Sequence, residues 1–131
     1  MGKDVAPPGY RVRTGIDLVP IEEFRRSLDR GGEAMRGRLF LPTEAAGASL
    51  ERLAGMFAAK EAAFKALGLP AGDWHVLAIK RRADGRPYIE LRGDYDSYHI
   101  ADIDLSISHA GGYAVASVVA LVRREHEEGR E

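Results

Sequence analysis

The sequence LERLAGMFAAKEAAFKALG at residues 50–68 determines the expected architecture, because it combines strong helix formers with no proline and a final glycine suited to a C-terminal cap. We predict one long helix here. With about 3.6 residues per turn, four apolar side chains share one face of this helix: Leu50, Leu53, Phe57 and Phe64. Glu61 falls in the middle of that apolar stripe. A carboxylate in such a place is costly unless a positive group meets it.

The helix alone leaves two interpretations of Glu61 open. In the first, Glu61 simply pairs with Lys65, in the favoured order of acid before base four residues apart, for about 0.2–0.5 kcal/mol. In the second, Glu61 binds a cation, while Lys60 and Lys65 bind anions. The second interpretation predicts a functional site on this helix.

The composition excludes several classes of function. The 131 residues suit one domain with a modest core, and a hydrophobic content of 45% is typical of a globular protein. A net charge of −1 argues against general affinity for nucleic acid, and the absence of cysteine excludes disulfides and thiolate metal sites. No apolar run approaches the roughly 20 residues that span a bilayer, and the N-terminus lacks the apolar core of a signal peptide. We therefore expect a cytoplasmic protein that binds neither nucleic acid nor membrane.

The first half of the chain predicts a strand followed by helices. The alternation in residues 10–19 indicates a strand. A helix should follow, opened by Pro20 and ended by Gly31 and Gly32. Its expected apolar edge consists of Ile21, Phe24 and Leu28. Short helical pieces should fill residues 33–49.

The second half predicts antiparallel strands. We expect a hairpin of strands at residues 75–81 and 88–91, a short helix at 93–101, and strands at 103–108 and 113–122 joined by a turn at 109–112. Helices and antiparallel strands mixed in this way predict an α+β fold, with a small antiparallel sheet packed against one long helix and shorter ones. The domain should span residues 10–122, between a flexible lead at 1–9 and a charged tail at 123–131.

Two places outside the long helix could carry chemistry. Asp17 closes a strand just after Gly15, where the backbone can approach a ligand closely, although a lone aspartate is more often a cap or turn residue. Ser108 and His109 end a strand before a Gly-Gly turn, although a lone histidine there is usually a satisfied polar group. The four histidines have no zinc-type spacing, and the sequence contains neither a P-loop nor a glycine-rich dinucleotide motif.

Four short segments together point to one family. They are GID at residues 15–17, FAAKEAAFKALG at 57–68, GRPYI at 85–89 and LSISHAGGYAVASVV at 105–119. In this order and at these distances they resemble the holo-acyl-carrier-protein synthases, which are the small 4′-phosphopantetheinyl transferases. The larger subclass of these transferases carries a second acidic residue two positions after the aspartate. Here that position is Val19, which favours the small single-domain type.

The resemblance implies an enzyme that transfers phosphopantetheine from coenzyme A to a serine of an apo acyl carrier protein and releases adenosine 3′,5′-bisphosphate. By motif match, Asp17 and Glu61 would hold a magnesium ion that also bridges the pyrophosphate. Glu61 is the first choice for the general base and Asp17 the second. In this family three chains form a homotrimer, and the sites lie in clefts between neighbours.

The remaining motif positions imply contacts with coenzyme A. Lys65 would bind the phosphates, and Lys60 would act as a phosphate ligand or as a helper in proton transfer. Ser108 and His109 match the block that contacts coenzyme A, with His109 near a phosphate.

Two positions depart from the family pattern. Most relatives carry a basic residue where this chain has Glu23, on the helix that docks an acidic carrier protein, and many carry arginine where it has Met56. We expect Arg25, Arg26 and Arg30 to take part in docking and to compensate for Glu23. A reversed charge at a docking site changes partner choice more than catalysis. The carrier is therefore expected to be of the fatty-acid type or, given Glu23, of a polyketide type.

Two other classes of function compete with an active transferase. One is a module that binds coenzyme A or a carrier protein without turnover, and the other is a structural trimer without a ligand. The presence of both Asp17 and Glu61 argues against the first, because a pure binder would not need two metal carboxylates. The second leaves the position of Glu61 unexplained.

Overall fold

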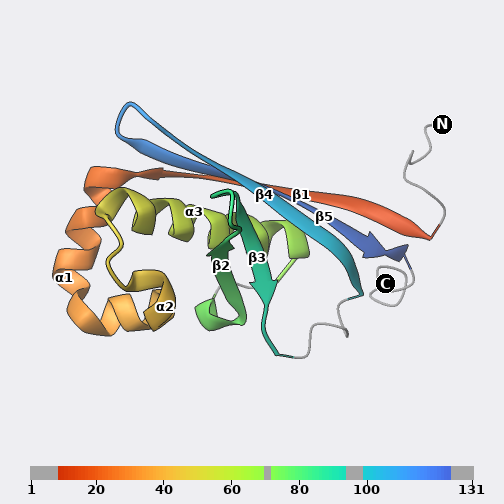
Figure 1. Ribbon diagram of the computed structural model, residues 1–131, viewed down its shortest axis with the longest axis horizontal. Helices are drawn as coiled ribbons and strands as arrows, with labels where there is room; N and C mark the ends of the chain where they lie inside the picture. The colour runs from red at the N-terminus through yellow and green to blue at the C-terminus, as the bar shows by residue number, and fades with distance from the viewer. Residues whose placement is uncertain (1–8, 70–71, 94–98, 125–131) are drawn as a thin grey trace.

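A computed structural model describes residues 9–69, 72–93 and 99–124, with helices packed against two antiparallel sheets (Figure 1). The chain order is β1 (Tyr10–Pro20), α1 (Ile21–Leu39), α2 (Pro42–Ala45), α3 (Leu50–Leu67), the short 3₁₀ helix η1 (Trp74–Val76), β2 (Leu77–Arg81), β3 (Pro87–Leu91), β4 (Ile100–Ala110) and β5 (Tyr113–Arg123). The larger sheet has the order β1-β5-β4, and the smaller sheet pairs β2 with β3. This is the predicted α+β arrangement. The predicted lead and most of the predicted tail lie outside the described residues.

The long helix α3 forms as predicted and is capped at both ends. The Ser49 hydroxyl accepts a hydrogen bond from the Arg52 N–H at 3.2 Å, and Gly68 ends the helix in a left-handed conformation with φ of 67°. The predicted apolar stripe lies only partly in the core, where Leu53 and Phe64 are buried. All the alanines of α3 are fully buried, whereas Leu50, Phe57 and Glu61 are only partly buried. The side of α3 that carries Leu50, Phe57 and Glu61 is thus more open than the sides that carry the alanines.

Strand β1 and helix α3 come into contact at Gly15. A Cβ atom at this position would lie 2.0 Å from the carbonyl oxygen of Ala62 and 2.9 Å from the backbone nitrogen of Ala66. No side chain fits such a gap, so the glycine allows the helix to lie directly on the strand. This contact fixes where Asp17 and Glu61 lie, because each is within two residues of it.

Helix α1 begins after Pro20 as predicted, with Phe24 buried, but it does not stop at its two central glycines. At Gly32 the backbone leaves the helical conformation, with φ of 60° and ψ of −155°, and a second helical segment then continues to Leu39. The predicted helix end is therefore a kink. A positive φ favours glycine, which explains why the pair signals a change of direction.

The hairpin of β4 and β5 turns more tightly than predicted. His109 and Ala110 belong to β4, and the turn consists of Gly111 and Gly112 alone, with φ of 56° and 82°. Positive φ at both turn residues is the geometry of a type I′ hairpin. The short helix predicted at 93–101 is wrong where it can be compared, because β4 already begins at Ile100. Residues 94–98 of that prediction lie outside the described residues.

The larger sheet has one covered face and one open face. Alternate residues of β5 are buried against α3, and the residues between them face the opposite side. The open face carries a group of exposed apolar side chains on β1 and β5: Tyr10, Val12, Ile16, Leu18, Tyr113 and Val119. The apolar strand β5 lies at the centre of this sheet, between β1 and β4. None of the described helices is long and apolar enough to cross a membrane.

Candidate active site

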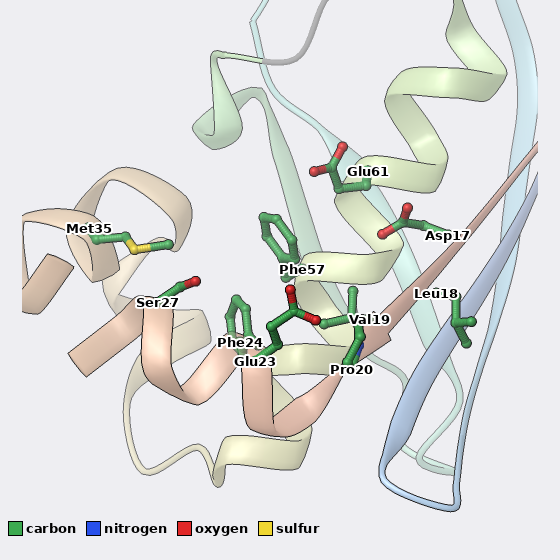
Figure 2. A pocket seen from close by; sticks show the side chains of 10 residues that line it. All are labelled: Asp17, Leu18, Val19, Pro20, Glu23, Phe24, Ser27, Met35, Phe57 and Glu61. Atoms are coloured by element: carbon green, nitrogen blue, oxygen red, sulfur yellow. The ribbon is translucent and has the colours of Figure 1, made fainter. Parts of the chain in front are cut away.

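A pocket of about 310 Å³ lies where the end of β1, the first part of α1 and the middle of α3 meet (Figure 2). Its acidic members are Asp17, Glu23 and Glu61. The apolar members are Leu18, Val19, Pro20, Phe24, Met35 and Phe57, with Ser27 on α1 as a further polar member. The pocket thus combines a carboxylate end with an aromatic wall.

Asp17 and Glu61 share the pocket because of strand alternation and the contact at Gly15. Asp17 points to the same face of β1 as Gly15 and Val19, the face that α3 covers. Glu61 lies on α3 one residue before Ala62, whose carbonyl oxygen abuts Gly15. Two residues that are 44 positions apart in the sequence are thereby brought to one site.

Lys65 contacts Asp17, and the predicted pairing of Lys65 with Glu61 is not formed. The Lys65 ammonium donates to the Ile16 carbonyl oxygen at 2.9 Å and to Asp17 Oδ1 at 3.2 Å. Glu61 makes no hydrogen bond or ion pair with another of the described residues. Burial raises the pKa of the Glu61 carboxyl, the nearby Asp17 carboxylate raises it further, and the Lys65 charge opposes both.

The two carboxylates fit a hard divalent cation such as Mg²⁺. Oxygen ligands from one or two carboxylates, completed by substrate oxygens and water, are the usual set for this ion. Over the described ranges, no group of three or more histidine, aspartate or glutamate side chains could form a protein-only metal site. A cation between Asp17 and Glu61 would also relieve the repulsion that raises the Glu61 pKa.

Lys60 does not lie in the pocket, which corrects its predicted contact with phosphate. Its side chain is 0% exposed, and its ammonium donates to Glu44 Oε1, the Leu39 carbonyl and the Trp74 carbonyl. An ammonium has three donors, and all three are used here. A direct role in proton transfer is equally incompatible with this position.

Ser108 and His109 do not join Asp17 and Glu61 within one chain. His109 lies opposite Ala114 and Asp17 opposite Ala116, so β5 separates them by two strand spacings, or about 10 Å. The His109 ring contacts the N-terminal part of α3, where Nε2 lies 2.8 Å from the Glu51 carbonyl oxygen. Ser108, the preceding strand residue, points to the opposite, open face of the sheet.

Comparison with known proteins identifies the family. The profile of the 4′-phosphopantetheinyl transferase superfamily (ACPS) matches residues 13–118. The chain belongs to this superfamily. Among its relatives, the holo-[acyl-carrier-protein] synthase of Frankia alni is 44% identical over 83% of this chain and 96% of its own. That of Micrococcus luteus is 42% identical over 89% and 97% of the two chains.

Solved structures of superfamily members confirm the fold. The Helicobacter pylori holo-[acyl-carrier-protein] synthase in complex with coenzyme A superposes with a TM-score of 0.78 at 31% identity, covering 82% of this chain and 98% of that one. The Neisseria meningitidis holo-[acyl-carrier-protein] synthase gives a TM-score of 0.75 at 30% identity over 82% and 96%. The predicted family and α+β fold are therefore both correct.

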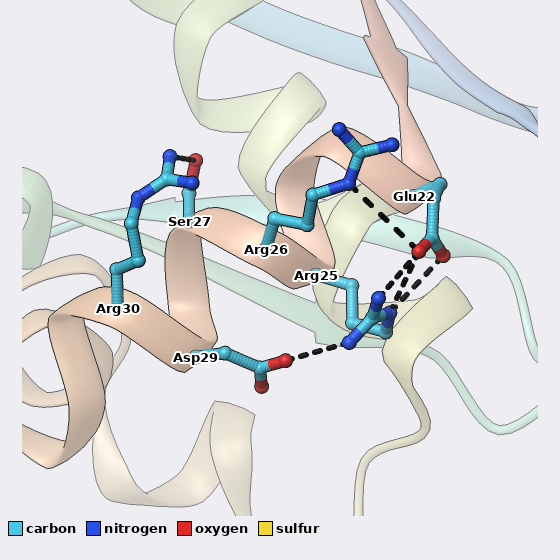
Figure 3. Close-up of polar contacts among 6 residues, drawn as sticks. All are labelled: Glu22, Arg25, Arg26, Ser27, Asp29 and Arg30. Carbon is cyan, nitrogen blue, oxygen red and sulfur yellow. Dashed lines mark hydrogen bonds and ion pairs between the residues drawn. The ribbon is translucent and has the colours of Figure 1, made fainter.

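The arginines of α1, expected to dock the carrier protein, are engaged within their own helix (Figure 3). Arg25 pairs with Glu22 and also with Asp29, the latter at 2.6 Å. Arg26 Nε lies 4.0 Å from Glu22 Oε1, and Arg30 Nη2 donates to the Ser27 hydroxyl at 3.5 Å. These contacts limit the compensation for Glu23 that the sequence predicts.

The structure places Met56 and Glu44 in the interior of the protein. Met56, where many relatives carry arginine, is 4% exposed and belongs to the core, so this chain presents no side chain to a ligand there. Glu44 was missed entirely, although it is the buried partner of Lys60. The only sequence signal near Glu44 is a local helix start at Pro42, which says nothing about a partner on α3.

Proposed function

We propose that this protein transfers the 4′-phosphopantetheine group of coenzyme A to a serine of an apo acyl carrier protein, with Mg²⁺, and releases adenosine 3′,5′-bisphosphate. Asp17 and Glu61 in one pocket, within a chain of this superfamily, are the observation that carries the proposal. The Helicobacter pylori relative was solved with coenzyme A, which supports coenzyme A as the donor.

Each side chain of the pocket has a defined task in this reaction. Asp17 and Glu61 would hold Mg²⁺, and the ion would supply positive charge to the diphosphate and to the leaving group. The serine oxygen forms a bond to the phosphorus that carries pantetheine, while the bond from that phosphorus to the bridging oxygen of the diphosphate breaks. The serine proton goes to Glu61 directly or through a water molecule, and Asp17 is the alternative base.

Lys65 binds a phosphate oxygen of coenzyme A at the edge of the pocket. Its side chain is 56% exposed, and one of its three donors has no partner among the described residues. A contact between an ammonium and a phosphate is a charge-assisted hydrogen bond, about twice as strong as a neutral one.

The site is completed by a second copy of the chain in a homotrimer. Within one chain His109 lies on the far side of β5 from Asp17, so Ser108 and His109 reach coenzyme A from a neighbouring subunit. The exposed apolar side chains on the open face of β1 and β5 offer a surface for that association. A cytoplasmic location stays a prediction from the sequence.

The mass of the carrier protein tests the transfer directly. The protein is incubated with coenzyme A, Mg²⁺ and several apo carrier proteins of the fatty-acid and polyketide types, and each carrier is weighed. A gain of one phosphopantetheine group on one serine supports the proposal. If no carrier gains mass while coenzyme A still binds, the chain is a binding module and the proposal is wrong.

Mixing subunits that carry different defects tests whether neighbours share a site. Asp17→Ala protein and His109→Ala protein are unfolded together, refolded and assayed. Shared sites require turnover above the mean of the two separate variants, because some interfaces then pair an intact Asp17 with an intact His109. If turnover equals that mean, Asp17 and His109 act from the same chain. Sedimentation measures the assembly itself, and a monomer at assay concentration would exclude the trimer.

A further inference from the structure

Lys60 is the centre of a buried polar network. Its Nζ donates to Glu44 Oε1 at 2.6 Å, to the Leu39 carbonyl oxygen at 2.9 Å and to the Trp74 carbonyl oxygen at 3.0 Å. The three acceptors come from α2, the end of α1 and η1. A single ammonium on α3 therefore holds three other segments.

Glu44 extends this network to the smaller sheet. Its Oε1 also accepts from the Leu41 N–H at 2.8 Å, and its Oε2 accepts from the Ile79 N–H on β2 at 2.7 Å. The side chains of Lys60 and Glu44 are 0% and 2% exposed. Every strong donor of Lys60 and both oxygens of Glu44 are thus satisfied inside the protein.

Stability alone is a poor explanation for this pair. Transfer of two charges into the interior costs several kcal/mol per ion, and well-packed apolar residues of similar size are often as stable or more stable. Burial lowers the pKa of Lys60, against the opposing effect of Glu44. What the pair adds over apolar residues is direction, because hydrogen bonds fix the angle between the segments that they join.

The network leads to the pocket by two routes. Along the chain, Lys60 directly precedes Glu61, so fixing the rotation of α3 at Lys60 also fixes the direction of Glu61. Through space, a series of rings reaches the pocket wall. The Lys60 ammonium lies 5.6 Å from the centre of the Phe40 ring, Phe40 meets Phe24 edge to face at 6.4 Å, and Phe24 stacks on Phe57 at 5.1 Å.

Trp74 closes the series of rings into a loop. Its ring centre is 5.3 Å from that of Phe57, and its carbonyl oxygen accepts from Lys60. Phe24 and Phe57 line the pocket beside the carboxylates (Figure 2). The buried ion pair and the aromatic wall therefore form one connected unit.

We propose that Lys60 and Glu44 are positioning residues of the active site, which set the rotation of α3 and the aromatic wall so that Glu61 lies in the same pocket as Asp17. The roles of Asp17 and Glu61 in this statement rest on the proposed function. The geometric effect itself can be measured by metal binding without any turnover.

The test compares variants that break the pair of Lys60 and Glu44, a variant that replaces the pair by two apolar residues, and a control variant that breaks a surface pair. Lys60→Met and Glu44→Met each leave one buried charge unpaired, while Lys60→Met combined with Glu44→Met removes both charges. Lys80→Met breaks the surface pair of Lys80 and Glu90, whose atoms are 3.0 Å apart and whose side chains are each 43% exposed. Melting temperature, Mn²⁺ binding by electron paramagnetic resonance, kcat and KM for coenzyme A are measured for each variant.

A positioning pair predicts that stability and function separate in the double variant. The single variants should lose roughly 10–20 °C in melting temperature. The double variant should recover part of that loss, because no buried charge is left unpaired, although four backbone groups lose their partners. The double variant should nevertheless bind Mn²⁺ about 10-fold more weakly and show kcat about 10–100-fold lower. Its KM for coenzyme A should change less than about 3-fold, and Lys80→Met should match the wild type in every measurement.

A stable double variant with wild-type Mn²⁺ affinity and kcat would overturn the proposal. Should the double variant fail to fold, Glu44→Gln decides, because it keeps the size of the side chain but leaves one of the accepted N–H groups without an acceptor. It must then show weaker Mn²⁺ binding while folded, and unchanged binding again refutes positioning. If the wild type binds Mn²⁺ but modifies no carrier, the proposed function fails, and the Mn²⁺ comparison still tests the pair.

Discussion

Helix α3 carries two lysines five residues apart whose surroundings are opposite. Lys60 is 0% exposed, and all three of its donors bind the protein. Lys65 is 56% exposed and, among the described residues, donates hydrogen bonds only to Ile16 and Asp17. A buried ammonium with no free donor can only hold the fold together. An exposed one with a free donor can bind a substrate anion. The residue type is the same, and burial decides the task.

The acidic partners repeat this contrast. Glu44 accepts three hydrogen bonds in the interior, while Glu61 has no hydrogen-bond partner among the described residues. Burial and the Asp17 charge raise the Glu61 pKa because no cation meets it fully. A binding site thus differs from a structural network in leaving its charged groups incompletely satisfied.

The largest effects are expected when either carboxylate of the pocket is removed. Asp17→Ala and Glu61→Ala should each lower metal-dependent turnover by at least about 100-fold, because each removes a group that places charge at the reacting diphosphate. Melting temperature and assembly should stay near those of the wild type. Near-normal turnover of either variant at low Mg²⁺ would refute the metal assignment. Unfolding of Glu61→Ala would instead favour a structural role for Glu61.

Lys65→Ala should show the next largest effect. Loss of one charge-assisted contact to phosphate costs about 1.5–3 kcal/mol, which corresponds to a decrease of roughly 10–100-fold in kcat/KM for coenzyme A. Its exposed pair with Asp17 is worth only about 0–1 kcal/mol, so the melting temperature should stay near that of the wild type, unlike that of Lys60→Met. Equal loss of stability in the two lysine variants would remove the distinction between the two sides of α3.

His109→Ala should reduce the use of coenzyme A less than Lys65→Ala does. The ring already contacts the Glu51 carbonyl, so it can offer only its other nitrogen to a phosphate. Dephospho-coenzyme A, which lacks the 3′-phosphate, tests this contact. Wild type should discriminate against it more strongly than His109→Ala, and equal discrimination would show that His109 does not contact that phosphate.

Glu23→Arg tests the charge that α1 presents to a carrier protein beside the pocket. Glu23 lines the pocket, and in the part of α1 before the kink at Gly32 the charges of Glu22, Glu23 and Asp29 balance those of Arg25, Arg26 and Arg30. An acidic fatty-acid carrier should therefore meet no net attraction here. The substitution should lower KM for that carrier about 2–5-fold at low salt, less at high salt, and leave KM for coenzyme A unchanged.

Steady-state kinetics at two salt concentrations decides between the possible roles of Glu23. An unchanged KM for the carrier would mean that Glu23 does not meet it. An increase would mean that a basic group of the carrier contacts Glu23, and the unfavourable contact would have to be abandoned.

The smallest expected effect concerns stability and pH. The folded protein holds the Glu61 proton more tightly than the unfolded chain does, so the stabilisation is complete below the ordinary pKa of 4.5 and is lost as pH rises through the raised pKa. Glu61→Gln is neutral at every pH and should therefore melt higher at pH 7, by on the order of 1–3 °C. The gain should vanish below pH 4.5, and thermal melts at both pH values measure it.

Sequence patterns predicted the order of elements, the long helix and the motif residues that line the pocket. The glycine just before Asp17 drew attention to this aspartate, and the motif match selected Glu61 and Lys65. The pattern failed for Lys60, because a helix rich in alanine is buried on nearly every side and its periodicity does not reveal the open one.

Residues that depend on distant partners could not be predicted. Glu44 contacts Lys60 because the fold brings α2 close to α3, and no local sequence pattern predicts that contact. Strand alternation does place Ser108 and His109 on opposite faces, but which face meets α3 depends on the whole sheet. The motif groups Ser108 and His109 with Asp17 by sequence alone, whereas β5 lies between them in one chain.

Gly15 shows how a residue without a functional group can decide activity. Even a methyl group at this position would collide with the Ala62 carbonyl oxygen, 2.0 Å away, and would force α3 off the strand. Asp17 and Glu61 would then separate although both remained intact. In a genetic screen, Gly15→Ala would inactivate the protein as the loss of Asp17 or Glu61 does. A map of variant effects should therefore include inactivating substitutions at positions that set the distance between a helix and a strand and carry no catalytic group.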